Sequence, residues 1–164
     1  MAIQNLKDVY TDQLADLWSA CSQSREVTMS LAQAAKSSEL RDALNAGAEG
    51  IQDGMSTVKE LAEKHGFDAE GEHCMGMEGL VREARSHALE EEFGDEDAQD
   101  AMIITQYQRM AHYAIAGWGC LEAFARRLEL EDDAAKLKEC LENTKHGDVH
   151  MSELATGGIN AAAA

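Results

Sequence analysis

Residues 67–94, FDAEGEHCMGMEGLVREARSHALEEEFG, separate two halves of the chain that each carry a pair of long helical patterns. Stretches rich in glycine and acidic residues enclose a short amphipathic segment, which predicts one short helix from about Cys74 to Glu91. An up-and-down bundle needs only a short loop between its second and third helices. The 28 residues found here instead predict a crossover that carries the chain back along the molecule, so that the next long helix starts at the far end.

Apolar residues recur every three or four positions on both sides of this crossover, as in amphipathic helices. The pattern predicts long helices over 6–36, 37–66, 95–128 and 132–155. The serines of SSEL at 37–40 and Asp95 or Asp97 suit the start of a helix, and Gly66 suits its end. The chain has no proline and is rich in residues that favour helices. The predicted fold is therefore an all-α, ferritin-like four-helix bundle whose long crossover contains a short fifth helix.

The length of 164 residues fits one domain with a sizeable core. We expect residues 1–156 to form the bundle and residues 157–164, GGINAAAA, to form a flexible C-terminal tail. Cys21, Cys74, Cys120 and Cys140 occur without any CxxC pair, which favours free thiols in a reducing cytoplasm.

The formal net charge is −17, with 31 acidic and 14 basic residues. Such a chain repels nucleic acid and anionic membranes, because binding to phosphate requires clustered Lys and Arg. No apolar run approaches the roughly 18 residues that span a bilayer, and the first residues resemble no secretion signal. A cytoplasmic location without nucleic-acid or membrane partners is the expectation.

A di-metal centre in a ferritin-like bundle needs carboxylates and imidazoles that point inward from its helices. Iron and manganese in such sites prefer oxygen and imidazole ligands. At the middle of this bundle the predicted inward positions are Cys21, Ala111, Ala114 and Thr144, none of which has a carboxylate. Gln52 lies at the edge of the inward face of its helix and is a poor substitute for an anionic ligand. The residues therefore predict a bundle without an intact di-metal centre.

Asp148 is the one carboxylate predicted to point inward, and Glu49 and His112 are the other weak candidates for metal ligands. Glu49 falls well off the apolar face of its helix, and His112 lies roughly opposite the inward face of its own. One inward acid cannot hold two metal ions. Because a buried acid must be hydrogen-bonded or neutralised, we expect Asp148 to bond to Thr28, Thr144 or a tyrosine hydroxyl. For His112 we expect packing or interface contacts.

Three segments of the sequence resemble the YciE/YciF family of ferritin-like bacterial proteins. They are LKDVYTDQLADLWSA at 6–20, CMGMEGLVREA at 74–84 and HYAIAGWGCLEAFARRLELEDDAAKLKECLENT at 112–144. The resemblance covers nearly the whole chain in order, and the second and third segments are fairly specific in combination. It implies a ferritin-like bundle that forms dimers and is associated with bacterial stress responses, with no established reaction.

Members of that family commonly carry a candidate di-iron site, and the resemblance assigns its ligand positions to this chain. Only Glu49, His112 and Asp148 match the pattern. Family ligands are replaced at Cys21, Gln52, Ala111, Ala114, Asn143 and Thr144. The resemblance therefore implies that the fold is kept and that the di-metal centre has been lost.

Three functions stay open, and we favour the first. It is a non-catalytic, stress-associated bundle that needs no cofactor and acts as a homodimer or through a protein partner. The second is an iron- or manganese-dependent oxidoreductase or iron-handling protein, with a shifted site built from Glu49, His112 and Asp148 and completed by Cys21 or Glu26. The third is a small-ligand binder, because replacing large acids by Ala or Thr can leave a cavity.

Overall fold

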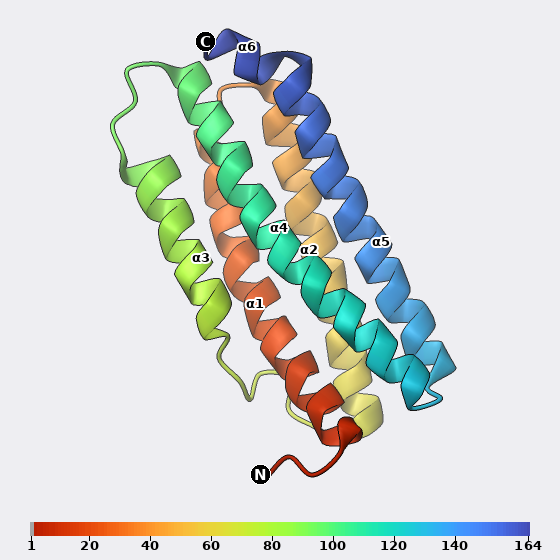
Figure 1. The fold of residues 1–164 in the computed structure, drawn as a ribbon. Helices are drawn as coiled ribbons and strands as arrows, with labels where there is room; N and C mark the ends of the chain where they lie inside the picture. Colours follow the sequence, from red (N-terminus) through yellow and green to blue (C-terminus); the bar gives the residue numbers. More distant parts are fainter. Residues whose placement is uncertain (1) are drawn as a thin grey trace.

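The computed structural model describes residues 2–164 as a bundle of four long helices with a shorter helix packed outside it (Figure 1). The long helices are α1 (Leu6–Ala34), α2 (Ser38–His65), α4 (Glu96–Arg127) and α5 (Glu131–Leu154). The crossover contains α3 (Met75–Arg85), which continues into the π-helical turn η1 (Ser86–Glu90). The all-α four-helix bundle with a short helix in a long crossover, predicted from the sequence, is thereby confirmed.

The crossover returns the chain to the end of the bundle where α2 began, so α2 and α4 run in the same direction (Figure 1). α1 packs against α2, α4 packs against α5, and the bundle closes through contacts of α1 with α4 and of α2 with α5. α3 contacts α1 and α4 and lies over the seam between them. In the described part of the chain, no helix lies over the opposite seam, between α2 and α5.

Local capping explains where the helices begin and end. Ser37 Oγ accepts a hydrogen bond from the Leu40 N–H at the start of α2, and an Asp95 carboxylate oxygen does the same for Asp97 at the start of α4. Gly66 ends α2 in the left-handed conformation with φ of 72°, which glycine adopts at little cost. The predicted boundaries of the long helices agree with the structure to within about two residues.

The C-terminal residues continue as helix beyond α5. The π-helical turn η2 (Ala155–Ile159) and the short α6 (Asn160–Ala162) contact α4 near its first turns (Figure 1). Ile159 packs against the hydrophobic core, and alanine has the highest helix propensity. Helical turns extend as far as Ala162, with a break at Gly158, where φ of 176° and ψ of −38° are not helical. The flexibility expected for residues 157–164 stays a prediction.

A buried carboxylate joins three helices at the end of the bundle where the N-terminus lies. Asp133, in the first turn of α5, has a side chain that is 1% exposed. It accepts hydrogen bonds from Tyr10 Oη at 3.0 Å, Lys64 Nζ at 2.5 Å and His65 Nε2 at 2.6 Å. Burial disfavours the carboxylate form, but these hydrogen bonds outweigh burial and hold the pKa of Asp133 below its usual value. The network ties α5 to α1 and α2.

A second buried carboxylate fixes the opposite end. Asp100 in α4 is 1% exposed and accepts the backbone N–H groups of Lys36 at 2.9 Å and Ser37 at 2.8 Å. It thereby satisfies two donors in the connection between α1 and α2, which otherwise have no helical partner.

Candidate functional site

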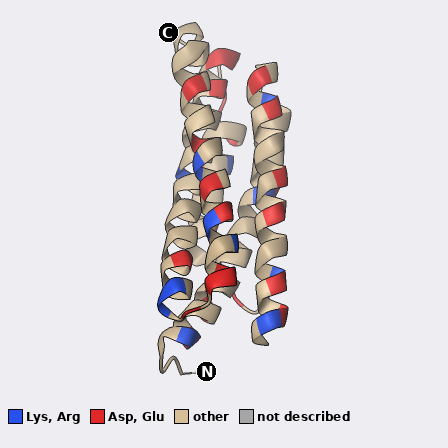
Figure 2. Ribbon diagram, turned by 90° about the vertical axis from the view of Figure 1, so that its right-hand side faces the viewer, with Lys and Arg blue, Asp and Glu red and all other residues tan. Residues whose placement is uncertain are grey.

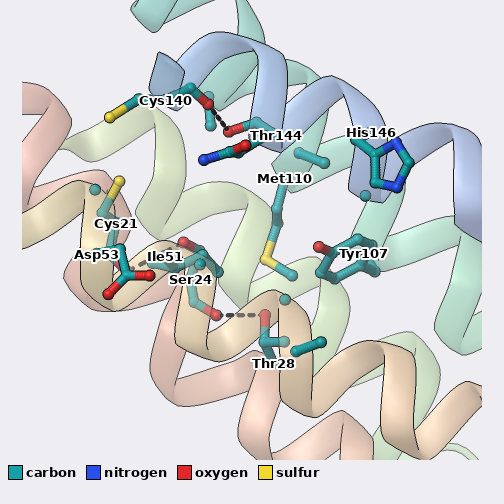
Figure 3. A pocket seen from close by; sticks show the side chains of 18 of the residues that line it. Cys21, Ser24, Thr28, Ile51, Asp53, Tyr107, Met110, Cys140, Thr144 and His146 are labelled. Carbon is teal, nitrogen blue, oxygen red and sulfur yellow. Dashed lines mark hydrogen bonds between the residues drawn. The ribbon is translucent and has the colours of Figure 1, made fainter. Parts of the chain in front are cut away.

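A groove of about 1130 Å³ enters the bundle along the uncovered seam between α2 and α5 (Figure 3). Residues of α1 and α4 form its floor, so the groove reaches the centre of the bundle. The floor includes Cys21, Ser24 and Thr28 from α1 and Tyr107, Met110 and Ala114 from α4. In a ferritin-like di-metal protein this region holds the metal ligands.

Glycines in α2 make room for two aromatic side chains that reach across from α4. A Cβ atom at Gly47 would lie 2.6 Å from Tyr107 Oη, and one at Gly54 would lie 2.9 Å from Trp118 Cζ2. Both distances are shorter than van der Waals contact, so these α2 positions require residues without a side chain. Tyr107 and Trp118 are eleven residues apart on α4, or about 16 Å at the usual helical rise. They bracket the middle of the groove.

The structure brings most of the replaced ligand positions together around this groove. Cys21 and Ala111 are buried, and Ala114 and Thr144 are partly buried against it. Asn143 also lines the groove with an exposed side chain. The sixth position, Gln52, is exposed and does not line the groove. The centre therefore offers thiol, methyl and hydroxyl groups in place of carboxylates.

The two thiols at the groove carry no charge at neutral pH in the metal-free chain. Burial, with smaller contributions from Cys140 and Cys74, raises the pKa of Cys21 to about 12. Burial also raises the pKa of Cys140, although a hydrogen bond with Thr57 opposes this. The thiols therefore do not supply the negative charge that the missing carboxylates would bring to the centre.

Asp148 does not point into the centre, so the prediction of an inward acid bonded to Thr28, Thr144 or a tyrosine is wrong. Its carboxylate lies at the seam between α4 and α5, where it accepts hydrogen bonds from Gln108 Nε2 at 3.1 Å and from His112 Nε2 at 3.0 Å. Leu137, Thr144 and Met151 lie on the inward face of α5, whereas Asp148 lies on the side of α5 that faces Gln108 and His112 of α4.

The remaining candidate ligands lie apart from one another. His112 is on the outside of α4, with 65% of its side chain exposed, and its one carboxylate partner is Asp148. Glu49 is exposed on α2, and Glu26 of α1 forms an ion pair with Arg85 of α3 at 2.7 Å. Among residues 2–164, no group of three His, Cys, Asp or Glu side chains has the arrangement needed to hold a metal ion. These residues therefore do not fit a di-metal centre, at the original or the shifted position.

Acidic side chains surround the mouth of the groove. Exposed carboxylates line it at Glu39, Asp42, Asp53, Glu60 and Glu139. Lys136, the lysine at the mouth, forms an ion pair with Glu60. Figure 2 shows that acidic residues also occur along the length of the helices rather than at one end. The groove thus combines an apolar floor with a negatively charged rim.

Comparison with known proteins agrees with this fold over its full length. A family model described as a domain of unknown function, DUF892, matches residues 5–164. The chain belongs to the DUF892 family. It is 29% identical over 161 residues to Protein YciF of Escherichia coli K12, covering 98% of this chain and 96% of that protein. The resemblance to the YciE/YciF family is therefore confirmed.

Two solved structures are similar to this chain. The crystal structure of the E. coli stress protein YciF superposes with a TM-score of 0.89 at 29% identity, covering 96% of this chain and 99% of that one. YcfI from Rhodopseudomonas palustris superposes with a TM-score of 0.85 at 27% identity, covering 92% and 94%. In the described DUF892 chain, no helix is both long and apolar enough to cross a membrane.

The sequence left a cavity at the centre open as one alternative, but it did not locate the groove between α2 and α5. The glycines of α2 give a weak signal for it, because Gly47, Gly50 and Gly54 follow the groove along one helix. Glycine in the middle of a helix is unfavourable and often marks a close approach of another group. Which side chain approaches, here Tyr107 or Trp118, depends on how the helices pack.

Proposed function

We propose that this DUF892 protein is a non-catalytic, stress-associated bundle that acts as a homodimer or through a protein partner, after loss of the family's di-metal centre. The observation that carries the proposal is the composition of the centre. Cys21, Ala111, Ala114 and Thr144 stand around the groove where a ferritin-like metal protein needs carboxylates. With those groups the centre supplies neither the charge nor the ligands for iron or manganese, and the function requires no cofactor.

Physical chemistry explains why such replacements persist once metal binding is lost. A carboxylate in a low-dielectric centre is costly to bury unless a cation or hydrogen-bond donors compensate it. Small apolar or hydroxyl side chains remove that cost and stabilise the metal-free bundle. Thr144 satisfies its hydroxyl within its own helix, by donating to the Cys140 carbonyl oxygen at 2.8 Å.

The association with stress rests on the relatives. The similar crystal structure from E. coli is described as that of a stress protein. The similarity extends over nearly all of both chains, which supports a related cellular role here.

Restoring acids to the centre tests the loss of the site. The double variant Ala111→Glu with Ala114→Glu places two carboxylates at the floor of the groove without matching ligands on α1 or α5. We expect it to be destabilised by at least about 2 kcal/mol in metal-free buffer, because buried polar groups without partners cost about 1–3 kcal/mol each. Thermal unfolding followed by circular dichroism measures this effect.

Ala116→Glu is the matched control, because Ala116 is exposed on the same helix. Its melting temperature should stay close to that of the wild type. A higher melting temperature for the double variant without metal would contradict the proposal.

Self-association needs a separate measurement. Light scattering at micromolar concentrations should give the mass of a dimer, twice the 17.8 kDa of one chain. A monomer throughout that range would remove the homodimer from the proposal and leave a protein partner.

A further inference from the structure

The dimensions of the groove fit an extended chain of atoms. Its α2 lining runs from Glu39 to Glu60, which corresponds to about 31 Å at the usual helical rise. A groove that follows α2 over that length accommodates an extended alkyl chain.

One polar group inside the groove has no partner. Tyr107 is 7% exposed, and its hydroxyl points into the groove between the glycines of α2 and α5 (Figure 3). A Cβ atom at Gly147 would lie 3.6 Å from this hydroxyl, and no described residue forms a hydrogen bond with it. The hydroxyl is accessible from the groove, so a ligand atom there can form a hydrogen bond with Tyr107 Oη.

The acidic side chains around the groove favour a ligand whose head group is positively charged. Asp42 and Asp53 of α2 and Glu139 of α5 line it with exposed carboxylates. Lys136 is already paired with Glu60. These charges repel a carboxylate or phosphate head group and attract an ammonium group. Between Tyr107 and the Trp118 ring, the floor is mostly apolar and suits an aliphatic chain.

We propose that the groove between α2 and α5 binds a straight-chain aliphatic amine. The alkyl chain lies along the floor between Tyr107 and Trp118, and the ammonium group donates a hydrogen bond to Tyr107 Oη below the acidic rim. The inference goes beyond the proposed function, because it gives the metal-free centre a ligand. It is also independent of the proposed function, because neither dimer formation nor the loss of the metal centre requires that an amine binds.

Dodecylamine below its micelle concentration is the probe, with dodecanoate as the anionic probe of the same chain length. In a Trp18→Phe background Trp118 is the one remaining tryptophan, so its fluorescence reports on the groove. We expect saturable binding of dodecylamine and at least tenfold weaker binding of dodecanoate. Equal affinities would overturn the assignment of the head group.

Two groove variants locate the binding site. Tyr107→Phe should weaken dodecylamine about tenfold or more, because a hydrogen bond to a charged group is lost. Gly50→Leu should abolish binding, since Gly50 lines the groove and has open space for a side chain. Gly79→Leu is the control, because Gly79 also has open space but lies on α3 away from the groove. Binding that survives Gly50→Leu would overturn the proposal.

Thiol labelling distinguishes a ligand from a second copy of the chain. Cys140 lines the groove and is partly exposed, whereas Cys120 is exposed outside it. Dodecylamine should slow maleimide labelling of Cys140 at least threefold and leave Cys120 unchanged. A Cys140 that is unreactive in a ligand-free dimer, but reactive after dilution to monomer, would show that a second copy covers the groove and would overturn the proposal. Neither result alters the metal content on which the proposed function rests.

Discussion

Replacing Asp133 by Ala tests whether the buried ionic network holds the end of the bundle together. The carboxylate of Asp133 is 1% exposed and is the shared acceptor for Tyr10, Lys64 and His65. Its removal leaves the Tyr10 hydroxyl and the largely buried His65 ring without their acceptor. The variant therefore loses a group that joins α5 to both α1 and α2 at this end.

The expected cost follows from the burial of the network. Removing one partner of a buried ion pair typically costs about 3–5 kcal/mol, because the other partner is left uncompensated. Lys64 is 48% exposed and recovers part of its solvation in water, so the lower half of that range applies here. For a chain of this length, about 3–4 kcal/mol corresponds to a fall of roughly 6–16 °C in the melting temperature.

Urea unfolding of both proteins, followed by circular dichroism at 222 nm, measures the difference. Asp132→Ala is the control, because Asp132 occupies the same first helical turn but is exposed. The control retains the network and should lose only the interaction of one acid with the helix dipole, about 0.3–1 kcal/mol. A loss in Asp133→Ala no larger than that in Asp132→Ala would refute the reasoning.

Three further outcomes follow from particular contacts. Because the pKa of Asp133 in the folded chain lies below its ordinary value of 3.8, its carboxylate stabilises the fold above that pH. This stability is lost as the pH falls through the folded-state pKa, so the difference in urea stability between wild type and Asp133→Asn should shrink below about pH 4. Asp100→Ala should lose about 1–3 kcal/mol in the same assay, because two backbone N–H groups lose their acceptor. Gly50→Ala should raise the free energy of unfolding by about 0.5–1 kcal/mol, because alanine favours the helix and the site has open space. Gly54→Ala should lower the free energy of unfolding by about 1–3 kcal/mol, because its methyl group would overpack against Trp118. Equal thermal shifts for the two glycine variants would contradict the packing described for α2.

The helices and their order could be predicted because local signals carry them. Ser37 and Gly66 are residues whose side chain or backbone freedom suits a helix end, and both act where expected. The long crossover is visible as two acidic, glycine-containing stretches around a short amphipathic segment. Such features depend on neighbours in the sequence, so they can be interpreted before any tertiary contact is known.

Features that depend on contacts between helices could not be predicted from local sequence signals. Asp148 falls on the apolar face when 100° is assigned to each residue, but in the structure its carboxylate bonds to Gln108 and His112 of α4. Asp133 resembles an ordinary acid in a first helical turn, and its role depends on partners more than sixty residues away in sequence. The groove likewise depends on aromatic side chains of α4 reaching glycines of α2.

The most direct measurement for the proposed loss of the di-metal centre is the metal content per chain. The protein would be purified from cells supplemented with iron and manganese, desalted gently and measured by inductively coupled plasma mass spectrometry. With Cys21, Ala111, Ala114 and Thr144 at the centre, we expect a metal content near zero in a stable helical protein. A content near two metal ions per chain would contradict the proposal and place a working site in this bundle.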